Sequence, residues 1–170
     1  MNLLFITLGP MIELLDNSVL PWALIACGIA QISKLFVELI RFRRWRPSVL
    51  LETGGMPSSH AAFVTGTASG VGLQLGFNHP GFAIASTLAL VVMYDASGIR
   101  RSSGLIASRV NELRAESWSS PPAQPLKENL GHKRTEVLVG SLIGPAIAIP
   151  GIFILGSPLH IANSLGFLVV

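Results

Sequence analysis

One polar, glycine-rich stretch of the chain carries the side-chain types needed to bind and protonate a phosphate, and an apolar run follows it at once. Gly54 and Gly55 let backbone N–H groups turn toward an anion. Ser58 and Ser59 add hydroxyl donors, and His60 titrates near neutral pH, so it can donate a proton. The alternative is an ordinary helix N-terminus, in which a serine caps the first turn and His60 faces the lipid headgroups.

A second polar stretch, much later in the chain, carries another histidine. His132 and Glu136 are four residues apart, so on a helix they share a face. The carboxylate could then hold one imidazole nitrogen while the other nitrogen points into a site. This arrangement indicates a nucleophile, paired with a general acid at His60. The alternative is a solvated charged face with an exposed histidine.

Lys34 is a charged residue inside an otherwise apolar segment. Such a residue costs roughly 3 kcal/mol on membrane-insertion scales and is by default a candidate for a functional site. Two alternatives remain open. The lysine side chain could extend to the membrane interface, or Glu38, one turn later, could neutralise it.

A carboxylate and two guanidinium groups follow another apolar segment, at Asp95, Arg100 and Arg101. Asp95 could form a structural ion pair with an arginine. Alternatively, Arg100 or Arg101 binds phosphate in the bidentate manner that lysine cannot achieve. A metal site formed by Asp95, Glu52 and Glu136 is conceivable, but no ligand cluster has a characteristic metal-binding spacing. We therefore expect no metal and no cofactor.

The composition places these residues in a membrane protein. Of the 170 residues, 50% are hydrophobic and 12% are charged, against roughly 25% charged in an ordinary soluble domain. The basic residues lie in polar loops of an apolar chain, which favours lipid headgroups or phosphate substrates over nucleic acid. Cys27 is the single cysteine, so no intramolecular disulfide can form.

The apolar segments predict the helices that must position the site. We expect one membrane domain over residues 1–170, an all-α, small polytopic bundle of about four to five membrane helices. Residues 1–19 are expected to form an interfacial or partly inserted segment, and the last 13 residues are too short to span alone. The two middle helices are short for full crossings, since about 20 residues are normally needed. The candidate membrane helices are residues 20–40, 61–77, 82–97 and 137–155.

Residues 99–135 form the longest polar segment. Within it, residues 106–113 predict an amphipathic surface helix, and residues 117–125 predict an irregular loop. This segment and the basic loop at residues 41–46 hold every Lys and Arg except Lys34, so none is left for the opposite face. The positive-inside rule therefore places both loops, and the glycine-rich stretch between them, on the cytoplasmic side.

Three motifs occur in a fixed order along the chain. They read Gly-Gly-Met-Pro-Ser-Ser-His at 54–60, Met-Tyr-Asp-Ala-Ser-Gly-Ile-Arg-Arg at 93–101, and Leu-Lys-Glu-Asn-Leu-Gly-His at 126–132, with Glu-Val at 136–137. Together they resemble the divergent branch of the superfamily of type-2 phosphatidic acid phosphatases and vanadium-dependent haloperoxidases. The resemblance covers most of the chain, from about residue 31 to residue 155.

The resemblance implies a helical membrane phosphatase that needs no cofactor. By this resemblance, Ser58 would bind phosphate and His60 would protonate the leaving oxygen. His132 would attack phosphorus to form a phosphohistidine, and Glu136 would orient it in place of the family's aspartate. Lys34 would be a candidate for the phosphate-binding lysine of the first family motif.

The chain departs from the family pattern at two positions. Ser59 stands where the family has a glycine. Lys127 stands one residue closer to His132 than the family's arginine does, so Arg100 or Arg101 could take its place at the phosphate. The charge distribution also puts the site inside, whereas the family's membrane phosphatases generally act on the outer face.

These observations predict a membrane phosphatase that hydrolyses a lipid-linked phosphate or diphosphate, such as a prenyl phosphate. The lipid tail would stay in the bilayer while the headgroup enters the site. The alternative is a non-hydrolytic protein that binds or moves a lipid phosphate or an anion, because transporters share polar and broken membrane helices. A haloperoxidase would need bound vanadate and is disfavoured by the membrane setting. The thin bundle also predicts a possible homo-oligomer.

Overall fold

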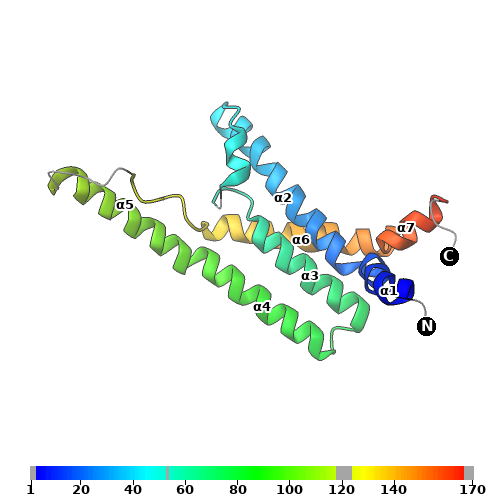
Figure 1. Cartoon of the computed structure of the whole chain (residues 1–170). Coiled ribbons are helices and arrows are strands. Elements are labelled where there is room, and N and C mark those ends of the chain that lie inside the picture. Colours follow the sequence, from blue (N-terminus) through cyan, green and yellow to red (C-terminus); the bar gives the residue numbers. More distant parts are fainter. Residues whose placement is uncertain (1–2, 53, 118–123, 167–170) are drawn as a thin grey trace.

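The structure, a computed structural model, describes residues 3–52, 54–117 and 124–166, and all secondary structure in these residues is helical. The prediction of an all-α membrane bundle is confirmed (Figure 1). A short 3-10 helix, η1, lies between the second and third α-helices. The elements are α1 (Leu3–Asp16), α2 (Val19–Phe42), η1 (Pro47–Leu51), α3 (Ser59–Leu75), α4 (Pro80–Ser97), α5 (Ile99–Ser117), α6 (Arg134–Leu155) and α7 (Pro158–Ser164).

Helix α3 lies at the centre of the bundle and packs against α2, α4 and α6 (Figure 1). Small residues make this packing possible. A β-carbon at Gly144 of α6 would collide with the Thr65 side chain of α3, and one at Gly66 would lie 3.4 Å from the Cα of Ala23 in α2. Close backbone approach through small residues is typical of helices that pack within a bilayer.

The buried face of α2 leads directly to the predicted site. Ala23, Ala26 and Ala30 are fully buried and recur at helical spacing, and Lys34 continues the same face one turn later. Because this face packs against α3 and α6, the lysine is held inside the bundle, in the C-terminal half of α2.

Three stretches of the described chain are long and apolar enough to cross a membrane: α2, Pro80–Leu113 and α6. Helix α3 has 17 residues, fewer than the roughly 20 that a full crossing takes. Large apolar side chains cover the outside of these helices, and they include Ile84, Leu138 and Phe153. These surfaces fit lipid contact, so the chain is an integral membrane protein.

The polar segment after α4 is more helical than the sequence indicates. A surface helix was expected at residues 106–113, but α5 runs from Ile99 to Ser117 and continues α4 almost end to end (Figure 1). Only Gly98 separates the two helices. Most of the irregular loop predicted at 117–125, residues 118–123, lies outside the described residues, as does Thr53 in the glycine-rich stretch.

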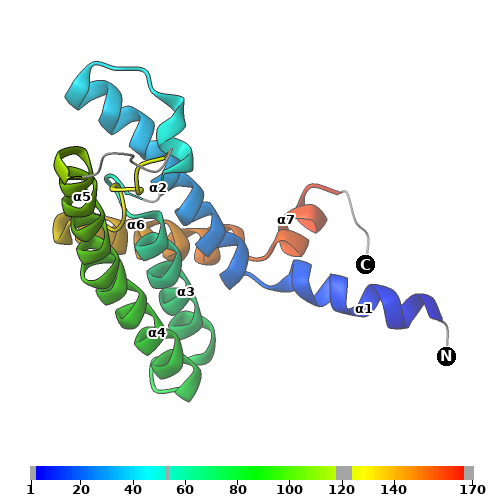
Figure 2. The same ribbon diagram turned by 60° about the vertical axis from the view of Figure 1, so that its left-hand side comes forward.

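The two ends of the bundle differ in composition. The C-termini of α2 and α4 meet the N-termini of α3 and α6 at one end, so the two polar loops contact each other there. At the other end α7 packs on α1, which extends away from the bundle (Figure 2). We call the first the polar end and the second the terminal end.

Candidate active site

A backbone hydrogen bond joins the glycine-rich loop to α6 at the polar end. Ser58 is fully buried, its backbone N–H donates to the Glu136 carbonyl at 3.0 Å, and its hydroxyl accepts from the Ala61 N–H at 3.3 Å. Ser58 is therefore the N-cap of α3, as the helix N-terminus interpretation predicts. Ser59 is buried in the first turn, beside Cys27 of α2. Both serines hold the loop in place.

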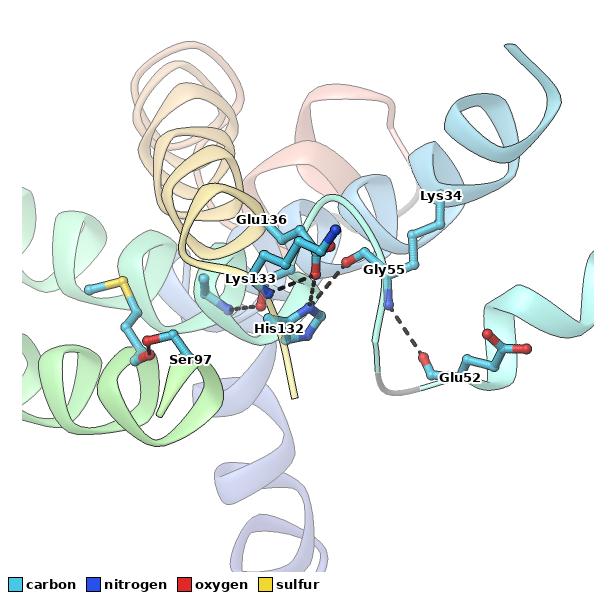
Figure 3. Close-up of polar contacts among 10 residues, drawn as sticks. Lys34, Glu52, Gly55, Ser97, His132, Lys133 and Glu136 are labelled. Carbon is cyan, nitrogen blue, oxygen red and sulfur yellow. Dashed lines mark hydrogen bonds and ion pairs between the residues drawn. The ribbon is translucent and has the colours of Figure 1, made fainter. Parts of the chain in front are cut away.

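His132 is buried, with a relative exposure of 2%. Its backbone N–H donates to the Ala96 carbonyl at 2.8 Å. Its Nδ1 lies 3.1 Å from the Gly55 carbonyl oxygen and 3.2 Å from Glu136 Oε2 (Figure 3). Because both neighbours are acceptors, Nδ1 carries the proton in the neutral ring, and Nε2 keeps a free lone pair.

Nε2 of His132 is the one buried side-chain nitrogen or oxygen without a hydrogen-bond partner among the described residues. An unpartnered buried polar atom is costly and calls for an explanation, such as a catalytic role. Glu136 fixes the ring from the opposite side, and its Oε2 also accepts from the Lys133 N–H at 3.1 Å. The predicted contact between His132 and Glu136 is thus present.

A cavity of about 180 Å³ lies beside His132, and we call it the histidine cavity. His60, Asp95 and Arg100 line its polar side, whereas Val91 and Val92 contribute apolar surface. Partial burial lowers the pKa of His60, and neighbouring cationic groups, Arg100 first among them, lower it further. The two histidines therefore share one small cavity, although they lie far apart in the sequence.

Asp95 and Arg100 form an ion pair at the rim of the histidine cavity, with Arg100 Nε 2.6 Å from Asp95 Oδ2. Both side chains are partly exposed, so the pair contributes little to stability. The contact occupies Nε, and within the described residues neither terminal amino group of the guanidinium has another partner, so both can bind a further oxygen ligand.

Lys34 lies on the other side of His132, not in the histidine cavity. Its exposure is 2%, and its Nζ donates to the Glu52 carbonyl at 3.4 Å (Figure 3). It lines a second cavity of about 200 Å³ with Gly55 and Glu136, which we call the lysine cavity. Glu38 does not neutralise Lys34, because its carboxylate pairs with Arg46 at 3.5 Å.

A third cavity, of about 410 Å³, lies between η1, α5 and the segment before α6, and we call it the polar cavity. Gly54 and Gly55 line it, as does Arg101. Lys133 lines both this cavity and the lysine cavity, although it was not predicted as a site residue. The available signal was its position next to His132, at the start of a membrane helix. Lys127 is exposed and lines none of the three cavities.

The carboxylates considered as metal ligands do not come together. Within residues 3–52, 54–117 and 124–166, no group of three His, Cys, Asp or Glu side chains is placed to hold a metal ion. Asp95 lines the histidine cavity, whereas Glu52 and Glu136 line the polar cavity.

The fold is a helical membrane bundle whose polar end holds a buried histidine, a glutamate beside it and a second histidine. The chain belongs to the divergent PAP2 family, whose model matches residues 15–147, so the resemblance is confirmed. It is 38% identical over 145 residues to a Bacillus subtilis protein titled "Uncharacterized membrane protein YuiD", covering 78% of this chain and 92% of that one. No solved structure matches the chain.

Proposed function

We propose that this protein hydrolyses a lipid-linked phosphate or diphosphate, such as a prenyl phosphate, through a phosphohistidine intermediate. One observation carries the proposal. The buried Nε2 of His132 has no hydrogen-bond partner within the described chain, and His132 lines a cavity together with His60. Membership of the divergent PAP2 family supports the same class of chemistry.

In the first step, the lone pair on His132 Nε2 attacks the phosphorus atom. The bond between phosphorus and the leaving oxygen breaks as the P–N bond forms, and His60 gives its proton to that oxygen. The products are a phosphohistidine at His132 and a lipid alcohol, or a lipid monophosphate where the substrate is a diphosphate. Glu136 accepts a hydrogen bond from the Nδ1–H group and stabilises the positive charge that forms on the ring.

In the second step, water replaces the lipid. The neutral His60 takes a proton from water, the oxygen attacks phosphorus, and the P–N bond breaks. Inorganic phosphate leaves, and both histidines return to their starting protonation states. One pair of side chains thus supplies both proton transfers.

Negative charge on the transferred phosphoryl group needs positive charge nearby. Arg100 lines the histidine cavity and binds Asp95 through Nε. We assign its two terminal amino groups to phosphate oxygens, so Asp95 positions the guanidinium. Lys34 and Gly55 act on the other side of the ring, where Gly55 accepts from Nδ1.

The lipid tail would lie along α4. Val91 and Asp95 line both the histidine cavity and an open groove, which Leu90 and Tyr94 of α4 and Ile99 of α5 complete. A tail in that groove could remain in the bilayer while its phosphate reaches His132. The distribution of Lys and Arg supports a site on the cytoplasmic side. The largely uncovered outer face of α4 also supports a homo-oligomer.

The alternative is a non-hydrolytic protein that binds or moves a lipid phosphate or an anion. Two observations favour it: Ser58 uses its hydroxyl to cap α3, and Lys34 does not line the histidine cavity. Fewer phosphate ligands then surround His132 than the family mechanism employs.

Phosphate release from a panel of prenyl and glycerolipid phosphates, by the detergent-purified protein, separates these two functions. His132→Ala and His60→Ala test the two roles, and His79→Ala is the matched control at the terminal end. Release that both site variants abolish and the control retains supports hydrolysis. Binding of the lipids without release by the parent protein would contradict hydrolysis and support the alternative.

A further inference from the structure

Three polar side chains recur along one face of α2, at Gln31, Lys34 and Glu38, and we call them the polar row. Their spacing of three and four residues puts them on the same side of the helix. None of the three lines the histidine cavity. The polar row instead faces the segment from Arg46 to Glu52, which leads into the glycine-rich loop.

Two members of the polar row donate to backbone carbonyl groups of that segment. The side-chain amide of Gln31 donates to the Leu50 carbonyl oxygen. Nζ of Lys34 donates to the Glu52 carbonyl oxygen at 3.4 Å. A neutral side chain and a charged one, one turn apart on α2, thus bind the same stretch of backbone in the same way.

The third member of the polar row binds the segment through an ion pair. The Glu38 carboxylate lies 3.5 Å from Nε of Arg46, and a terminal amino group of Arg46 lies 3.1 Å from the Glu52 carboxylate. Glu52 is therefore held twice, by Arg46 at its side chain and by Lys34 at its backbone. The polar row fixes the position of the segment before the glycine-rich loop.

Lys34 also lies beside the residue that holds the ring of His132. Gly55 is located between Lys34 and His132 (Figure 3). A β-carbon at Gly55 would lie 4.0 Å from Cδ of Lys34, so the aliphatic part of the lysine passes beside the Gly55 backbone. On the other side, the Gly55 carbonyl oxygen lies 3.1 Å from Nδ1 of His132. Both contacts of Lys34 are with the backbone that leads to this carbonyl group.

We propose that Lys34 is a positioning residue for His132 rather than a phosphate ligand. On the proposed function, from which this role follows, Lys34 holds the Gly55 carbonyl against Nδ1, so that Nε2 faces the histidine cavity. Gln31 contributes to the same task without a charge. This assignment departs from the resemblance, which makes Lys34 a candidate for a phosphate-binding lysine. Arg100, which lines the histidine cavity, is the cation that meets the phosphate.

Binding of a lipid phosphonate separates a positioning role from a ligand role. Dodecylphosphonate, whose C–P bond is not hydrolysed, is titrated into the protein in phosphatidylcholine nanodiscs and followed by phosphorus NMR. Arg100→Gln should weaken binding about tenfold, the loss expected for one charge-assisted contact. Lys34→Met should bind as the parent does. A loss of affinity in Lys34→Met as large as that in Arg100→Gln would overturn the proposal.

The Nδ1–H group of His132 reports the positioning without any hydrolysis. Its proton–nitrogen NMR signal, in protein labelled at histidine, is identified by its loss in His132→Ala. Lys34→Met and Gln31→Leu should both shift this signal, because the Gly55 carbonyl is no longer held against Nδ1. Ser33→Ala is the matched control and should leave the signal in place, since the Ser33 hydroxyl donates to a carbonyl of its own helix.

Gln31→Leu makes this NMR test decisive. Because Gln31 carries no charge, its variant separates movement of the loop from the loss of a nearby charge. A signal that moves only in Lys34→Met would reflect the lost charge, and a signal that moves in neither variant would show that the polar row does not position the ring. Either result would overturn the proposal. Gln31→Leu also keeps the test open to failure if Lys34→Met does not fold.

Kinetics give a third measurement where the parent releases phosphate. Both polar-row variants should lower kcat by roughly tenfold to a hundredfold, with KM little changed, because misplacement of a reacting group by about 1 Å can cost about 10²-fold. A loss confined to KM in Lys34→Met would indicate a lost ligand and contradict the assignment. A parent that neither binds the phosphonate nor releases phosphate would contradict the proposed function, and the Nδ1–H signal would still decide whether Lys34 positions His132.

Discussion

The two ends of the bundle each carry two histidines, yet their surroundings differ. At the terminal end, His79 is exposed and its Nδ1 accepts from the Gly81 N–H at 3.0 Å, which caps α4. His160 is exposed in the first turn of α7. At the polar end, His132 is buried with Nε2 unpartnered, and His60 shares its cavity. All four residues are histidines, so it is their burial and their hydrogen-bond partners that distinguish the proposed catalytic pair.

Charge separates the two ends in the same way. No Lys or Arg occurs in residues 1–33, 47–99 or 135–170, so the segments that form the terminal end carry neither. The polar end gathers Lys34 and the two basic loops around the histidines. An anionic headgroup is therefore attracted to one end only. The predictions below test whether function follows this division.

His132→Ala should have the largest effect. Loss of the attacking nitrogen removes the proposed intermediate, so phosphate release should fall by about 10⁴-fold or more. His79→Ala, which removes a histidine from the terminal end, should leave the rate unchanged. Steady-state phosphate release measures both variants. An equal loss in both would show that the two ends do not differ in the way we describe.

His60→Ala should have the next largest effect. Removal of a general acid typically costs 10²-fold to 10⁴-fold, roughly, because the leaving oxygen must depart unprotonated. A substrate with a good leaving group, such as a nitrophenyl phosphate, should recover most of the lost rate, and His132→Ala should not respond. Equal loss with both substrates would argue against an acid role for His60.

The pH dependence of cleavage should carry the signature of His60. A general acid acts only when protonated, and its pKa lies below the ordinary value of 6.5. Cleavage should therefore fall as pH rises through that lowered pKa, giving a decline that starts below about pH 6.5. His60→Gln should lack this decline. A parent profile that stays flat across this range would contradict the assignment.

A matched pair of glycines gives the smallest effect and sharpens the comparison most. Gly131 at the polar end and Gly156 at the terminal end have φ of +73° and +71°. Alanine at Gly156 should cost about 1–3 kcal/mol of stability, because a β-carbon strains the backbone at positive φ. Alanine at Gly131 should cost more, because its β-carbon would also collide with the Arg101 backbone. Thermal unfolding in detergent measures this cost.

Only Gly131→Ala should also reduce phosphate release, since its β-carbon would collide with the backbone of Arg100 and Arg101, next to His132. Gly156→Ala serves as the control for the strain alone. Activity loss in both variants, at equal stability, would mean that the whole bundle rather than the polar end sets the activity.

Much of the fold could be predicted from the sequence. Apolar runs gave the membrane helices, and the N-cap preference of serine placed the start of α3 near Ser58. The four-residue spacing predicted the contact between His132 and Glu136, which is present although His132 lies just before α6 rather than on it. Glu136, in the first turn of α6, reaches back to the His132 ring and to the Lys133 N–H. These features arise from local sequence, which is why local reasoning finds them.

The arrangement of the site could not be predicted in the same way. Lys34 points to the Glu52 carbonyl, and Lys133 lines two cavities, because the loops before α3 and α6 pack against each other. The full length of α5 depends on its continuation of α4 and on contacts such as that of Asn111 with the Leu126 carbonyl. Such tertiary contacts override local propensity.

Trapping of the covalent intermediate tests the central claim most directly. The parent protein would be mixed with a lipid phosphate labelled on phosphorus, quenched during turnover under alkaline conditions, and mapped by peptide mass spectrometry. We predict an acid-labile phosphoryl group on His132, present in His79→Ala and absent in His132→Ala. Turnover that labels no residue, or a residue other than His132, would contradict the account.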